Sequence, residues 1–159
     1  MPAKRSAGLL LFRRTAEDHV EVLIGHMGGP FWAAHDEAAW SIPKGEYAAD
    51  EPPADAARRE FEEELGVPAP QGEWIDLGEA RQGNGKLVTI WAVEADLDPA
   101  RTVPGTFSME WPRGSGVIRE FPEIDRVGWF GLDAARPLLV AGQRVFLARL
   151  AERVGADGG

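Results

Sequence analysis

The stretch that decides the fold is residues 45–67, which read GEYAADEPPADAARREFEEELGV. Within it, Pro53–Leu65 is predicted to be a helix, because a proline suits the first helical turn and Glu51 or Pro52 can occupy the N-cap position. Gly66 is a residue that commonly follows a helix C-terminus. A four-residue repeat supplies the apolar stripe by which the helix packs onto a core, namely Ala57, Phe61 and Leu65.

The same helix carries a crowded acidic face. Glu60, Glu63 and Glu64 lie on one narrow side, because residues three and four positions apart are neighbours on a helix. Carboxylates at this spacing repel one another by a few tenths of a kcal/mol per pair. Taken alone, such a run is usually solvated helix surface, and Arg59 can soften the repulsion by pairing with Glu63.

The run does not stand alone, because the whole stretch resembles the Nudix box, G-x5-E-x7-R-E-U-x-E-E-x-G-U, where U is a bulky apolar residue. The matching positions are Gly45, Glu51, Arg59, Glu60, Phe61, Glu63, Glu64, Gly66 and Val67. Phe61 is a mild departure, since the family more often has an aliphatic residue there. The resemblance implies the α/β class and the Nudix α/β/α sandwich, with a mixed sheet and helices on both faces. We expect one Nudix hydrolase domain over residues 1–159, with 155–159 as a frayed tail.

The resemblance also implies an activity, which is metal-dependent cleavage of a pyrophosphate bond in a nucleotide-like small molecule. Mg²⁺ is the expected cofactor, with Mn²⁺ as a substitute, and a helix that presents several carboxylates suits such hard cations. They would neutralise the pyrophosphate and activate the attacking water. The resemblance implies that Glu63 and Glu64 bind the metal and that Glu60 is a further ligand or orients the water. It also implies supporting roles: Arg59 forms salt bridges to the glutamates, Glu51 supports the loop, and Gly45 supplies an unusual backbone conformation.

One further carboxylate is expected from outside the box. Family members often supply it from a loop shortly before a late strand that bears a tryptophan, and Glu123 lies six residues before Trp129. Glu123 is therefore the candidate metal ligand or general base, in a mobile loop that approaches the metals late. Glu110 and Glu120 are rivals, and an ordinary surface glutamate is the alternative.

Substrate contacts are predicted around the box. Lys44 directly precedes Gly45, and this Pro-Lys-Gly entry looks like the dinucleoside polyphosphate and diphosphoinositol polyphosphate branches of the family. Lys44 is a candidate phosphate contact, with a solvated lysine as the alternative. Trp32 is a candidate for stacking on a base, whereas Trp40 is assigned to a structural aromatic cluster. Arg81 and Lys86, on or beside a predicted hairpin, are candidate phosphate contacts.

The composition limits the partners. A net charge of −9 and the lack of a basic patch argue against a nucleic acid polymer as the ligand. The sequence has no cysteine, no signal-like segment and no stretch apolar enough for a membrane. We therefore expect a cytoplasmic protein that binds a small-molecule nucleotide and no membrane, and leave a homodimer open.

Periodicity predicts the remaining elements. Expected strands are 7–12, 20–26 (after a turn at 15–19), a short one near 40–42, a pair at 74–81 and 86–95 around the turn 82–85, and 126–130. Expected helices are 132–140 and 142–154, while 25–53 and 98–122 are predicted to be loops.

The substrate stays open at this point. Dinucleoside polyphosphates or nucleoside triphosphates are favoured. ADP-ribose, sugar nucleotides, diphosphoinositol polyphosphates and capped RNA are the alternatives within the family. About sixteen residues past the box, the segment Gln82–Gly85 has neither the proline expected of ADP-ribose hydrolases nor the tyrosine expected of diadenosine polyphosphate hydrolases. A nucleotide-binding sensor domain is the alternative from another class, although such domains usually lose box glutamates.

Overall fold

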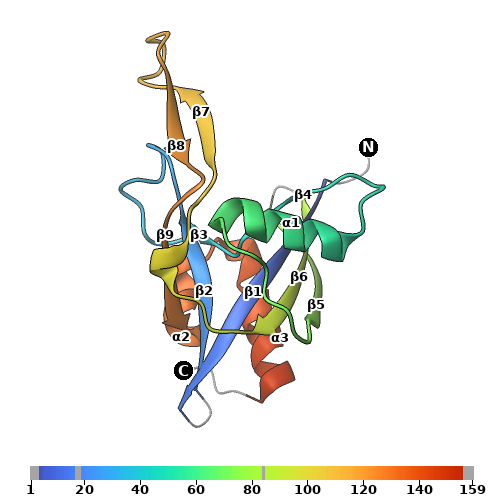
Figure 1. Cartoon of the computed structure of the whole chain (residues 1–159). Coiled ribbons are helices and arrows are strands. Elements are labelled where there is room, and N and C mark those ends of the chain that lie inside the picture. The colour runs from blue at the N-terminus through green and yellow to red at the C-terminus, as the bar shows by residue number, and fades with distance from the viewer. Residues whose placement is uncertain (1–3, 17–18, 84, 156–159) are drawn as a thin grey trace.

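The computed structural model describes residues 4–16, 19–83 and 85–155. Seven strands form one mixed sheet (Figure 1), whose central path runs β3-β2-β1-β6-β5, with β4 added to β1 and β9 to β2. Among these described strands, β1 and β6 form the parallel pair and the other pairs are antiparallel. Their bounds are β1 Arg5–Ala16, β2 His19–Met27, β3 Trp40–Ser41, β4 Lys44–Glu46, β5 Ile75–Arg81, β6 Leu87–Glu94 and β9 Ile124–Gly131.

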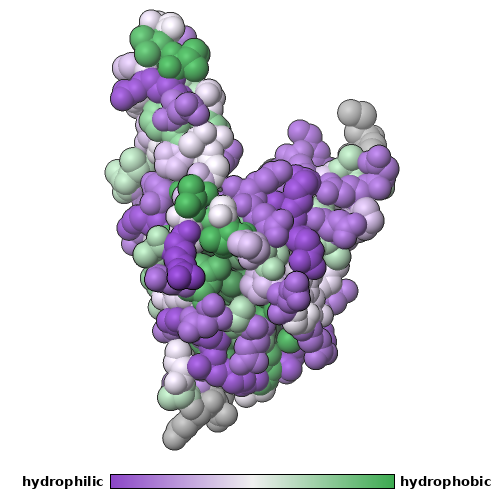
Figure 2. All heavy atoms as spheres, viewed as in Figure 1, coloured by the Kyte–Doolittle hydropathy of each residue, from purple (hydrophilic) through white to green (hydrophobic). Residues whose placement is uncertain are grey.

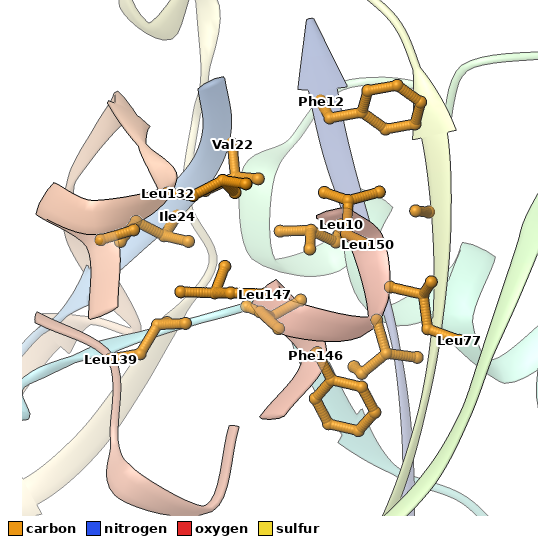
Figure 3. Packing of buried hydrophobic residues seen from close by; sticks show 14 of the residues in the cluster. Leu10, Phe12, Val22, Ile24, Leu77, Leu132, Leu139, Phe146, Leu147 and Leu150 are labelled. Carbon is orange, nitrogen blue, oxygen red and sulfur yellow. The ribbon is translucent and has the colours of Figure 1, made fainter. Parts of the chain in front are cut away.

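Helices cover both faces of the sheet, as the sequence predicts. Helix α1 (Pro53–Leu65) packs against β1 on one face, while α2 (Leu132–Leu138) and α3 (Val145–Val154) cover the other. Strand β1 shows why two layers form, because successive side chains of a strand point to opposite faces. Its buried residues divide accordingly: Leu9 and Leu11 pack with Phe61 of α1, and Leu10 and Phe12 pack with Phe146, Leu147 and Leu150 of α3 (Figure 3).

Helix α1 begins and ends at the predicted residues. Pro52 is the N-cap and Gly66, at φ 68°, closes the C-terminus in the left-handed conformation that favours glycine. Glu62, the variable position of the acidic run, has a structural use, since its carboxylate accepts a hydrogen bond from the Ala69 backbone N–H at 2.9 Å. Phe61 and Leu65 are fully buried. The helix is therefore held rigidly by its apolar side, which leaves its acidic side to face outward.

The prediction that 98–122 is a loop was wrong. The segment contains a short 3-10 helix, η1 (Pro99–Arg101), and an antiparallel ribbon of β7 (Thr106–Glu110) and β8 (Ile118–Pro122), which projects from the body of the molecule (Figure 1). Prolines and glycines between and beside these short strands hide them in the sequence. Figure 2 shows hydrophobic atoms at the ribbon's tip, where Val117 and Ile118 are exposed.

Smaller differences concern element ends. β1 and β2 are longer than predicted, and β4, which pairs Gly45 with Ala7, lies inside the expected loop 25–53. The last helix starts at Val145 after a 3-10 turn, η2 (Ala141–Gln143). Parts of the predicted turns at 15–19 and 82–85, and of the tail 155–159, lie outside the described residues. Within the described part of the chain, no helix has the length and apolar character needed to cross a membrane.

Candidate functional site

The acidic face of α1 borders an opening of about 490 Å³. We call it the carboxylate opening; its lining is Lys44, Gly45, Glu46, Glu60, Glu63, Glu64, Gly105, Thr106 and Glu123. Strand β4 supplies one wall, α1 the second, and the base of the β7–β8 ribbon with the following residue supplies the third. The three glutamates of the acidic face and the carboxylate predicted from outside the box thus border a single space.

Glu123 lies between β8 and β9, and its backbone is held on both sides. Its N–H donates to the Gly105 carbonyl at 2.8 Å, and its carbonyl accepts from the Gly28 N–H at 2.9 Å. The expectation of a mobile loop at Glu123 therefore needs correction, since the residue joins two strands and is pinned to the end of a third. A freely moving element at this point would have required an unpaired backbone.

The two rival carboxylates are engaged elsewhere and do not line the carboxylate opening. Glu110 accepts hydrogen bonds from the backbone N–H groups of Gly114 and Gly116 in the ribbon's turn. Glu120 accepts from the Thr106 hydroxyl at 2.8 Å. Both have structural uses within the ribbon, which favours Glu123 for the role that the sequence left open.

Arg59 neutralises part of the acidic face. Its guanidinium pairs with both oxygens of Glu51 at 2.9 Å, with Glu60 at 2.7 Å and with Glu63 at 3.4 Å. The hydrogen bonds that the Arg59 guanidinium donates to Glu51 and Glu60 raise the pKa of Arg59 further above its already high ordinary value. Glu51 thereby ties the loop before α1 to the helix, and Glu60 is held with its carboxylate over β4.

Glu64 is the buried member of the three. Burial raises the pKa of its carboxyl to about 8, and the charges of Glu60 and Glu123 act in the same direction. The Lys44 backbone N–H, which donates to Glu64 at 3.1 Å, and the Lys44 ammonium oppose this shift. Burial in turn lowers the pKa of Lys44, while Glu64 opposes that change. The pair therefore lies deep in the opening with its charges poorly solvated.

Gly45 has a different purpose from the one expected. Its φ is not among the positive values of the described glycines, so no unusual backbone conformation requires glycine here. A Cβ atom at this position would instead overlap the carboxylate of Glu60. Glycine therefore lets strand β4 pass close to the Glu60 carboxylate without displacing it.

The donor set suits a hard divalent cation. Oxygen ligands from Glu60, Glu63, Glu64 and Glu123 match those that Mg²⁺ binds in proteins. The positive charge of such a cation would offset the cost of burial and the repulsion between carboxylates, which together raise the pKa of Glu64. Within the described residues, no three such groups are already drawn together at ligand distance. Arg59 occupies Glu60 and Glu63 instead, so ligation requires these side chains to turn.

A second opening of about 390 Å³ shares Lys44 with the carboxylate opening. We call it the side opening; its lining is Met27, Trp32, Ser41, Lys44, Gln82, Gly83, Lys86, Val140, Ala141, Gly142 and Gln143. Trp32 and Lys86, two of the predicted substrate contacts, line this opening together, and Lys44 lines both openings. Arg81 lines neither opening; it is exposed and donates to the Gly85 carbonyl across the hairpin turn.

Among the lining residues that the sequence analysis did not name, Glu46 and Gln143 make specific polar contacts. Glu46 pairs with Lys86 at 3.0 Å and borders the carboxylate opening. Gln143 is fully buried: its Oε1 accepts from the Ile42 N–H, and its Nε2 donates to the Ser41 hydroxyl. The position of Glu46 just after Lys44-Gly45 was the available signal for the first, whereas the second depends on contacts a hundred residues apart in the chain.

Comparison with solved structures shows the same fold. An Ap4A hydrolase from C. elegans in a binary complex superposes with a TM-score of 0.64 at 19% identity, over 96% of this chain and 98% of that one. The NUDIX domain of Shewanella oneidensis NrtR, complexed with ADP ribose, gives 0.60 at 15% identity, over 97% and 90%. A MutT/nudix family protein from Enterococcus faecalis gives 0.56 at 21% identity; the match covers 83% of this chain but 45% of the larger protein.

The family assignment comes from the sequence itself. A comparison with curated proteins gives no match, but the sequence profile of the NUDIX domain matches residues 2–150. That range contains the sheet, α1 and both openings. The chain belongs to the Nudix family and is a hydrolase that acts on pyrophosphate bonds.

Proposed function

We propose that this chain is a divalent-metal-dependent pyrophosphohydrolase that cleaves a phosphoanhydride bond in a small nucleotide. The observation that carries this proposal is the carboxylate opening, which Glu60, Glu63, Glu64, Glu123 and Lys44 line together. The box glutamates are intact, which favours an enzyme over a domain that only binds nucleotides.

Mg²⁺, or Mn²⁺ in its place, would be held by Glu63 and Glu64 with Glu60 and Glu123 as further ligands. When bound, such a cation offsets phosphate charge and lowers the pKa of a coordinated water. Arg59 keeps Glu60 and Glu63 oriented while they are unliganded. The oxygen-only donor set, without sulfur or histidine, supports a hard cation over zinc.

Glu123 lines the carboxylate opening from a different segment than α1, and we propose that it accepts the proton of the attacking water. A base must lie within hydrogen-bond reach of the proton it removes, and geometry in a ligand-free structure is often looser than in the complex. Lys44 presents an ammonium group between the two openings, where it would contact a phosphate as a point charge.

The substrate class that we favour is a dinucleoside polyphosphate or a nucleoside triphosphate. Phosphates would lie in the carboxylate opening, and a nucleoside in the side opening against Trp32, because an aromatic ring offers a stacking surface for a base. The fold alone does not choose among substrates. One neighbour is an Ap4A hydrolase and another carries ADP ribose, both below 25% identity.

The test is hydrolysis of a nucleotide panel in ¹⁸O-labelled water, with products identified by mass spectrometry. The panel contains nucleoside triphosphates, dinucleoside polyphosphates, ADP-ribose and coenzyme A, each measured with Mg²⁺, with Mn²⁺ and in excess chelator. Glu63→Gln and Glu64→Gln should lower turnover by orders of magnitude, while Glu152→Gln, an exposed change on α3, should not. Full activity in chelator would exclude the metal, and a preference for ADP-ribose or coenzyme A would exclude the substrate class.

A further inference from the structure

We propose that His26 is a positioning residue for this site, because its imidazole ties the loop that carries Trp32 to the strand that follows Glu123. The inference rests on the proposed function only in assigning Trp32 and Glu123 to the substrate. Its structural part concerns two segments, residues 28–39 and 123–125, which border different openings and are far apart in the sequence.

The contacts of His26 are short and buried. The side chain is 1% exposed at the end of β2. Its Nδ1 lies 2.7 Å from the Asp125 carboxylate, two residues after Glu123, and its Nε2 lies 2.6 Å from the His35 backbone carbonyl, three residues after Trp32. One ring therefore spans the gap between the two segments, and the edge of the Trp40 ring packs against it.

The chemistry of these contacts defines the state of the ring. A carboxylate and a backbone carbonyl can only accept hydrogen bonds, so both bonds form only when each ring nitrogen carries a proton. Asp125 is itself part of a wider set of ion pairs. Asp125 also lies 3.9 Å from Arg126, and Arg126 lies 3.6 Å from Asp36, whose carboxylate accepts from the Trp40 indole. His26 is the donor at the centre of this network.

The loop needs such a tie. Ala38 has φ 55°, a left-handed conformation that costs a non-glycine residue energy and persists only where the surroundings enforce it. Backbone hydrogen bonds hold the loop at its ends, from Gly28 to Glu123 and from Ala38 to Pro137. The bond from His26 reaches its middle, near Trp32. We therefore infer that removing it loosens Trp32 and, through Asp125, the segment that carries Glu123.

The test compares His26→Gln, Asp125→Ala and Asp125→Asn with the control Asp133→Ala. Asp133 is an exposed aspartate that pairs with Arg136 on α2, away from both openings. His26→Gln and Asp125→Ala should speed amide hydrogen exchange in residues 28–39. Each of these two variants is also assayed with the nucleotide that the wild type hydrolyses best. Each should raise KM and lower kcat by about tenfold, the change expected for the loss of one charge-assisted hydrogen bond. Asp125→Asn keeps an acceptor oxygen and should restore most of both losses.

A spectroscopic signature separates positioning from general destabilisation. The chain has three histidines, so a long-range ¹⁵N–¹H spectrum of the labelled wild type resolves each ring, with His26 assigned by its loss in His26→Gln. The two hydrogen bonds require a proton on the ring nitrogen that faces Asp125 and another on the ring nitrogen that faces the His35 carbonyl. Should His26→Gln fail to fold, Asp125→Ala carries the test, because the Asp125 side chain is 32% exposed and tolerates truncation.

Two results would overturn the inference. One is an unprotonated ring nitrogen on His26, and the other is unchanged exchange and unchanged KM and kcat in a folded Asp125→Ala protein. Both the exchange and the ring spectrum are measured without substrate. If the wild type hydrolyses no nucleotide, the proposed function is contradicted. The exchange rates and the ring spectrum would still show whether His26 connects residues 28–39 to Asp125.

Discussion

Glu64→Gln has an effect on stability that depends on pH and on metal. In the metal-free protein, burial raises the pKa of Glu64 to about 8 from an ordinary value of 4.5. The folded state therefore resists ionisation of this group, and the unfolded state does not. By linkage, this carboxyl leaves the free energy of unfolding unchanged below about pH 4.5 and lowers it progressively as the pH rises. Above about pH 8 the reduction is constant. Glutamine, which stays neutral, removes that penalty.

The size of the effect follows from the shift. Each pKa unit corresponds to about 1.4 kcal/mol, so the full shift amounts to roughly 2–5 kcal/mol, the lower figure allowing for relaxation around the charge. In excess chelator, Glu64→Gln should unfold at nearly the same urea concentration as the wild type at pH 5. At pH 9 it should be the more stable protein by that amount.

The assay is urea unfolding followed by tryptophan fluorescence at pH 5 and pH 9, with and without Mg²⁺. Glu152→Gln, which removes one exposed charge from α3, controls for net charge. Added Mg²⁺ should stabilise the wild type at pH 9 and have little effect on Glu64→Gln, because ligand binding to the folded state stabilises it. Equal stability differences at the two pH values, or a less stable Glu64→Gln at pH 9, would refute the burial argument.

Three further changes test separate parts of the site. Gly45→Ala should lower turnover at least tenfold, because its Cβ pushes the Glu60 carboxylate away from the place where it lines the carboxylate opening. Loss of the Glu60 bond to Arg59 should lower the free energy of unfolding by at most about 1.5–3 kcal/mol; wild-type kinetics in this variant would show that Glu60 can be moved freely. Glu123→Gln should cut kcat by roughly 10²–10⁴ with a smaller change in KM, while Glu110→Gln should not; the reverse order would transfer the role to Glu110. Phe61→Ala should lower the free energy of unfolding by about 3–5 kcal/mol, since Phe61 is fully buried; urea titration measures it, and a loss below about 1 kcal/mol would contradict its place in the core.

Local patterns predicted the elements whose stability is local. The Pro53–Leu65 helix could be placed from its proline, its closing glycine and its apolar stripe, since each acts within one or two turns. The paired strands before and after residue 84 were predicted for the same reason. The β7–β8 ribbon could not be, because its pairing of Phe107 with Phe121 joins residues with glycines and prolines between them that are typical of loops.

The sequence by itself determined the family and the α/β class, and the spacing of Glu60, Glu63 and Glu64 along one helix is enough to put these three carboxylates on one face. Tertiary structure supplies the arguments for the rest of the proposed site. The choice of Glu123 over Glu110 and Glu120 depends on which carboxylate the sheet carries to the open side of α1. The exclusion of Arg81 from both openings and the tie from His26 to Asp125 depend on strand register. Periodicity fixes the face on which a side chain lies, but which faces meet depends on long-range packing between segments far apart in the chain.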